Sequence, residues 1–169
     1  MVGILSKETR LLQNPALGAV ILWKFALTYY EANDTHEAPA LQLLFLILPM
    51  VLQESTRSVI LSTRKSSSLR AFAEKFSSSQ MSKADVVLSL QRRIDDLKTL
   101  SMDSIEIMVG SGMATIEAES GRVIPSKARG LKQEIPDGID PLLRAAEYLG
   151  IWMSGISVYE TVVTLRIFL

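Results

Sequence analysis

In the stretch LQLLFLILPMVLQESTR, residues 41–57, apolar residues follow one another almost without interruption and then give way to a short polar tail. A membrane-spanning helix needs about 20 consecutive apolar residues. This run is shorter, contains Gln42 and carries Pro49 inside it. A helix that is apolar on all sides is normally enclosed by other elements. The stretch therefore predicts a buried central helix, which Pro49 should kink or divide in two.

Apolar residues at helical spacing predict further helices on both sides of this stretch. Asn14 followed by Pro15 is a typical helix start, and the helix that it opens should run to about Ala32. Ser157 and Glu160 form the pattern of a capping box, which predicts a short helix near the end of the chain. The remaining helices are predicted over residues 68–76, 83–98, 100–111 and 140–152.

MATIEAESGRVIP, residues 113–125, alternates apolar and polar residues about a Ser120-Gly121 turn, which is typical of a β-hairpin. Two helices followed by a hairpin are the order of a winged helix-turn-helix. We therefore predict a mostly α fold in one domain over residues 1–169, with a small β-hairpin wing. Its parts would be a helical core, a winged-helix-like segment, and C-terminal helices packing back on the core: 14–65, 66–127 and 140–169.

Composition narrows the class of protein. The 169 residues contain no cysteine and no secretory-type leader, so a cytoplasmic protein without disulfides or thiolate metal sites is expected. Eighteen basic and 18 acidic residues balance, so there is no global basic field for nucleic acid. A hydrophobic content of 48% and a mean hydropathy of +0.24 fit either apolar surface covered by a partner or a large helical core.

Residues that could carry chemistry are sparse. His36 is the single histidine and lies in a predicted polar turn, with no cysteine or second histidine to share a metal. The glycines form neither GxGxxG nor a P-loop. We therefore expect a protein that is not an enzyme and that uses no cofactor or metal.

The winged-helix pattern suggests DNA binding as a function. The charge of its second helix, however, argues against recognition of the base sequence. The helix that would enter the major groove contains Asp103 and Glu106 and no basic residue over 101–111. Basic residues on the wing and on the link after the central helix could hold phosphates or a protein partner. An ordinary solvated loop contains the same residue types. The candidates are Arg57, Arg64, Lys65, Arg70, Arg122, Lys127 and Arg129.

Three blocks carry a family resemblance: NPALGAVILWKFALTYY, APALQLLFLILPMVLQESTRSVILSTRKSSSLRAF and AAEYLGIWMSGISVYETVVTL. Within them the helix start at 14–16, Leu48-Pro49, Thr56-Arg57 and the Ser-Ser-Leu of 67–69 are the most characteristic. The chain resembles the middle component of bacterial three-component ABC ATPase systems, nearly from end to end. The closing RIFL, residues 166–169, departs from the usual family ending.

The resemblance implies a non-catalytic adaptor that joins an ABC-type ATPase to a third component carrying variable effector domains. Such a set of proteins is thought to act against phage or other invading DNA. Contact with DNA through the complex and formation of a homo-oligomer are left open, and no membrane is implied. The alternative function is that of a winged-helix DNA-binding protein, acting as a regulator or as a DNA sensor.

Overall fold

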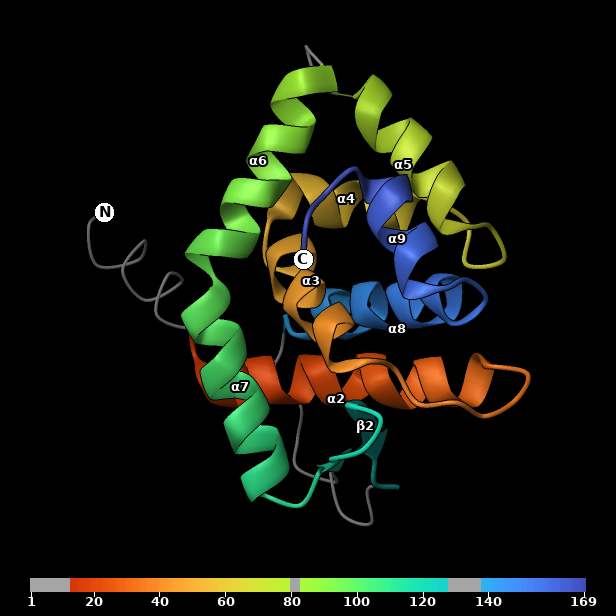
Figure 1. The fold of residues 1–169 in the computed structure, drawn as a ribbon. Coiled ribbons are helices and arrows are strands. Elements are labelled where there is room, and N and C mark those ends of the chain that lie inside the picture. The colour runs from red at the N-terminus through yellow and green to blue at the C-terminus, as the bar shows by residue number, and fades with distance from the viewer. Residues whose placement is uncertain (1–12, 80–82, 128–137) are drawn as a thin grey trace.

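The computed structural model describes residues 13–79, 83–127 and 138–169, without the side chains of 83–88 (Figure 1). These residues form eight helices and one two-stranded antiparallel hairpin, so the mostly α prediction is confirmed. The elements are α2 Pro15–Ala32, α3 Leu41–Val51, α4 Glu54–Ser62, α5 Leu69–Ser78, α6 Lys83–Asp96, α7 Lys98–Gly110, β1 Ala114–Glu117, β2 Arg122–Pro125, α8 Asp140–Ser154 and α9 Val158–Leu165.

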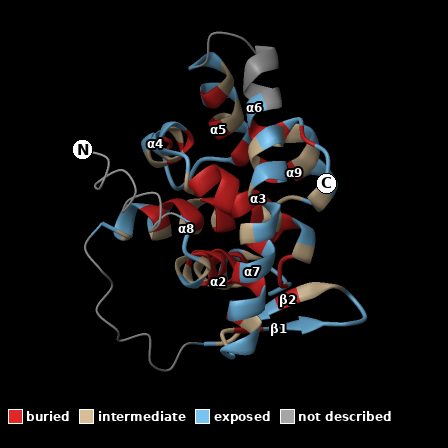
Figure 2. Ribbon diagram, turned by 90° about the vertical axis from the view of Figure 1, so that its left-hand side faces the viewer, coloured by how far each residue is buried: buried red, intermediate tan, exposed pale blue. Residues whose placement is uncertain are grey.

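Helix α3 is the buried centre of the fold, as its composition predicts. It is in contact with α2, α4, α6, α7 and α8, and Figure 2 shows it as a buried segment in the middle of the molecule. Its side chains from Leu46 to Leu48 are completely inaccessible. The long apolar run is therefore explained by enclosure on all sides.

The apolar run is divided, but after Val51, so the predicted break at Pro49 is wrong. Helix α3 continues past the proline because Leu52 N still donates to Leu48 O at 2.9 Å. The chain then bends by 101° into α4. The Arg57 guanidinium donates to Val51 O at 2.9 Å and to Leu52 O at 3.3 Å. Arg57 thus satisfies the last carbonyls of α3, which a helix end otherwise leaves unpaired.

Within the described parts of the chain, no single helix has the length and apolar character needed to cross a bilayer. Only α3 and α4 taken together reach that length and composition, and they are sharply bent relative to each other.

Two helix caps form as the local sequence predicts, whereas Asp140, which was expected to cap α8, is its first helical residue and makes no cap bond. Asn14 Oδ1 accepts from Ala16 N at 2.9 Å, with Pro15 in the first turn of α2. Ser157 Oγ accepts from Glu160 N, and Ser157 N donates to Glu160 Oε2, which completes the capping box of α9. These bonds are local, so their residue types reveal them without knowledge of the fold.

Helix α2 packs against α7 and α8, and a glycine lies at each of these contacts. A methyl group built at Gly18 would lie 2.1 Å from Ser104 Oγ of α7. One built at Gly150 of α8 would lie 2.9 Å from the main-chain oxygen of Phe25. A side chain at Gly150 would therefore meet the α2 backbone, and one at Gly18 would meet the Ser104 side chain, so both contacts depend on glycine.

The hairpin forms in the predicted place but is fastened to the core. Arg122 pairs with Ala40 in a β-bridge, Leu41 N donates to Gly121 O, and Val123 N donates to Pro39 O, both at 2.9 Å. The outer edge of β2 is thus occupied by the segment that leads into α3. β1 and β2 pair over residues 114–117 and 122–125.

The helix-turn-helix part of the prediction is not confirmed. Only Leu97 separates α6 from α7, and the two helices follow each other along one side of the molecule (Figure 1). Leu97 N donates to Arg93 O, and Ser101 N donates to Leu97 O, both at 2.9 Å. A helix-turn-helix instead has a turn of three or four residues and two helices that cross at about 90–120°.

Candidate partner-contact surfaces

The link between α4 and α5 is tied to α8, and this contact uses one of the predicted basic residues. Lys65 forms an ion pair with Glu147, while its main-chain oxygen accepts a hydrogen bond from Trp152 Nε1 at 3.1 Å. Arg57 of α4 bonds to the carbonyls at the end of α3, so two of the four candidates in this region have contacts within the chain. Arg64 and Arg70 are exposed.

Arg122 of the hairpin is also engaged within the protein. One guanidinium nitrogen donates to Ala38 O at 2.6 Å, and the other lies 3.1 Å from Glu37 Oε2. The side chain therefore joins the hairpin to the loop between α2 and α3. Lys127 is exposed, and Arg129 lies outside the described residues.

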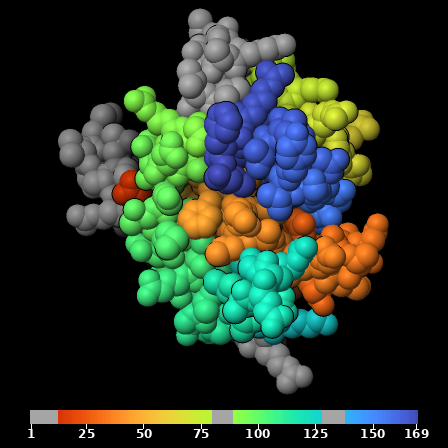
Figure 3. Space-filling view, in the orientation of Figure 1, coloured from red at the N-terminus to blue at the C-terminus, as the bar shows by residue number. Residues whose placement is uncertain are grey.

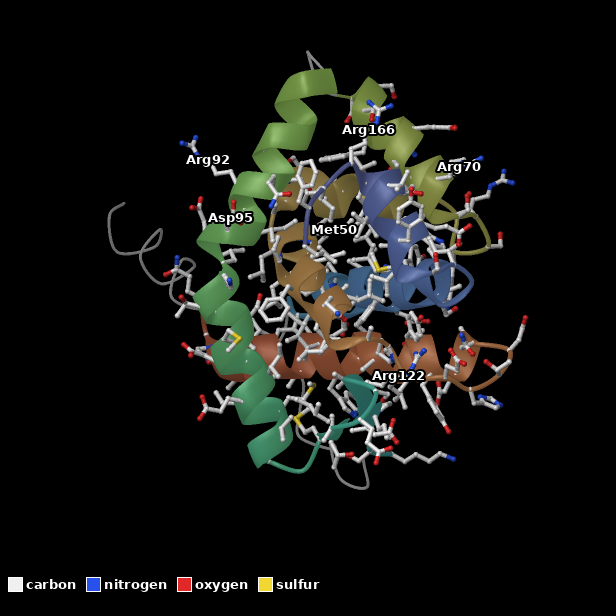
Figure 4. The ribbon with its side chains drawn as sticks, viewed as in Figure 1. Met50, Arg70, Arg92, Asp95, Arg122 and Arg166 are labelled. Carbon is white, nitrogen blue, oxygen red and sulfur yellow. The ribbon has the colours of Figure 1, made fainter. Side chains whose placement is uncertain are left out.

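The predicted basic residues do not converge on a single patch. Figure 4 places Arg70 on α5 and Arg122 beside α2, in different parts of the molecule. Among the described candidates, Arg64, Lys65 and Arg70 of the α4–α5 region and Lys127 after the hairpin are exposed, although Lys65 is paired with Glu147.

A polar cleft of about 370 Å³ lies beside Arg122, between the end of α2, the loop that follows it and the start of α9. Tyr29 and Ser157 line this cleft together with Glu37. Burial raises the pKa of the Tyr29 phenol, while the nearby Arg122 charge lowers it and the Glu37 charge raises it. The sequence did not point to this cleft, because its lining comes from three separate parts of the chain: residues 29–40, Arg122 and residues 154–160.

The outward face of α7 combines acidic and apolar side chains. Asp103 and Glu106 are exposed there, as are Met102 and Ile107, while Ser104 faces the core. This face carries no basic residue between Met102 and Gly110. Its charge suits a protein partner with basic groups better than a phosphate backbone.

His36 lies in an exposed turn, as predicted. Its backbone has φ 52°, and its ring is 5.6 Å from that of Tyr30. No group of three or more histidine, cysteine, aspartate or glutamate side chains that could hold a metal is found among the residues that the structure describes.

The comparison with protein families gives a match over nearly the whole chain. Residues 2–168 match the family model described as ABC-three component (ABC-3C) system Middle Component 3. The chain belongs to this family. The resemblance inferred from the sequence blocks is thereby confirmed, and this middle component is one part of a three-component system, so it has partners in that system. Neither the curated proteins nor the solved structures contain a significant match to it.

Proposed function

We propose that this middle component is a non-catalytic adaptor that links the ABC-type ATPase of its system to the third, effector component. The observation that carries the proposal is the family match over residues 2–168. On this proposal the complex works in the cytoplasm against phage or other invading DNA. The middle component itself would bind proteins and transmit the state of the ATPase through its contact surfaces.

The exposed side chains support a protein-binding role. The α7 face presents Met102 and Ile107 beside two acids, and apolar residues that reach solvent in this way are typical of interaction surfaces. Arg64 and Arg70, on the other side of the core, can pair with carboxylates of a partner. Two separate surfaces are what an adaptor between two proteins requires.

The DNA-binding alternative has less support in the geometry. Its wing would have to hold phosphates with Arg122, which is already bonded to Ala38 O and Glu37. Its recognition helix α7 exposes Asp103 and Glu106, which would repel phosphates.

The test is to co-express the tagged chain with the ATPase and the third component of its own system and to purify it after nuclease treatment at physiological salt. Recovery of both proteins in fixed proportion supports the adaptor. A further purification with Met102→Glu and Ile107→Glu together should lose one partner and keep the other, while Lys127→Ala should keep both. Recovery of the chain alone, or of partners only when DNA is left in place, would contradict the proposal.

A further inference from the structure

The outward side of α9 and the tail that follows it form a second apolar surface, distinct from the α7 face. Tyr159 and Val163 lie one helical turn apart on α9 and are 76% and 54% exposed. Phe168 and Leu169 of the tail are 80% and 53% exposed. Figure 3 shows the tail lying directly against α9, next to α6. Large exposed aromatic side chains of this kind are typical of the centres of protein interfaces.

The tail is held in place although its side chains reach solvent. Phe168 N donates to Gln91 Oε1 at 2.8 Å, and Gln91 Nε2 donates to Phe168 O at 3.3 Å. The neighbouring Ile167 is buried, and its main-chain nitrogen donates to Val162 O at 3.2 Å. Because the backbone is already ordered, a partner that covers Phe168 would lose little conformational entropy.

Arg166, between α9 and the tail, adopts a backbone conformation that its residue type disfavours. It has φ 54° and ψ 48°, the left-handed region, at a helix end where glycine or asparagine is usual. The conformation costs about 1–2 kcal/mol for a residue with a side chain. The Arg166 side chain is exposed and makes no ion pair with any described residue. Because this strained position carries an arginine instead of a glycine, we take its guanidinium to contact another molecule.

The charges on this surface are self-complementary. Glu160 precedes Val163 by three residues and Arg166 follows it by three, and one carboxylate oxygen of Glu160 is not used by the capping box. Three residues of helix rise about 4.5 Å. In an antiparallel pair of α9 helices centred on Val163, Glu160 of each copy would therefore lie near the C-terminal end of the other helix, where Arg166 directly follows the last helical residue Leu165.

We propose that the α9 and tail surface, defined by Tyr159, Val163, Arg166 and Phe168, is the interface between two copies of this chain. Two-fold interfaces use the same patch on both subunits and need such self-complementarity. The formal net charge of +0 adds no long-range repulsion between copies. The central valines would meet each other, and the aromatic side chains would cover the pair on both sides. This proposal does not depend on the adaptor role.

The test is to measure the molar mass of the purified chain by sedimentation equilibrium over a range of concentrations. We expect a dimer, and Val163→Glu should weaken it by about 30-fold or more, as the loss of a central contact does. The matched control is Ile124→Glu, an exposed apolar residue on β2, which should leave the dimer unchanged. Circular dichroism should show all variants folded.

Arg166→Gly separates the interface role from a structural one. Glycine adopts φ 54° without strain, so the variant should melt at a higher temperature than wild type when both are diluted to monomers. Its dimer should nevertheless be about 10-fold weaker, because the pair with Glu160 is lost. A chain that is monomeric at every concentration would overturn the proposal. A dimer that Val163→Glu leaves intact would also overturn it. So would a Val163→Glu variant that loses binding of another protein while its dimer keeps wild-type strength.

Discussion

Gly150→Ala tests whether the close approach of α2 and α8 is as tight as the structure shows. The added methyl group would lie 2.9 Å from Phe25 O, 3.0 Å from Tyr29 N and 3.1 Å from Thr28 Cβ. Two of these three atoms belong to the α2 backbone, so no side-chain rotation can relieve the overlap. Forcing extra atoms into a packed core costs about 1–3 kcal/mol, and we expect the upper end here.

Alanine is also a better helix former than glycine by about 1 kcal/mol, which offsets part of this cost. The net loss in the free energy of unfolding should be about 2 kcal/mol, or roughly 4–8 °C in Tm for a domain of this size. The control is Gly110→Ala in α7, where a methyl group meets nothing within 4 Å. Urea unfolding followed by circular dichroism measures both. Equal stability of the two variants would refute the packing of α2 against α8.

Three further outcomes follow from individual contacts. Arg122→Met removes the bond to Ala38 O and should lower the free energy of unfolding by about 1 kcal/mol in a urea titration. The ion pair with Glu37 adds little to this loss, because it is partly exposed to solvent. Lys127→Met is the control and should leave the free energy of unfolding unchanged. Ser157→Ala removes the capping box of α9 and should cost about 1 kcal/mol in thermal unfolding, whereas a change no larger than that of exposed Ser67→Ala would contradict the role of the cap. Burial raises the pKa of Tyr29 above 10.0, so the unfolded chain loses this proton first and stability falls as the pH rises past 10. Tyr29→Phe should make that fall shallower, and an unchanged profile between pH 9 and 11 would show that the phenol is not buried.

Local features of the fold were predictable because their causes lie close together in the sequence. The apolar run of α3 required enclosure, and the alternation about Gly121 required a hairpin. The Asn14 and Ser157 caps bond to atoms two or three residues away. None of these depends on the rest of the chain, and each formed where the sequence placed it.

The features that the sequence did not predict depend on contacts between residues far apart in the chain. The helix-turn-helix was inferred from the order of elements alone, although Leu97 and its neighbours include no glycine or proline to make the turn. The bond of Arg122 to Ala38 O joins positions 84 residues apart, and the ion pair of Lys65 with Glu147 joins positions 82 residues apart. From the sequence, Arg122 and Lys65 were both predicted to be available to a partner, because no neighbouring residue indicates these contacts.

The pairing of β2 with the segment before α3 joins the hairpin mechanically to the most deeply buried helix. Val123 and Leu41 lie on opposite sides of this seam, and α3 begins at Leu41 without an intervening loop. A displacement of the hairpin is therefore transmitted directly to the first turn of α3. The amides of Val123 and Leu41 should exchange with solvent deuterium at similar rates, since both hydrogen bonds belong to the same seam between β2 and the segment before α3.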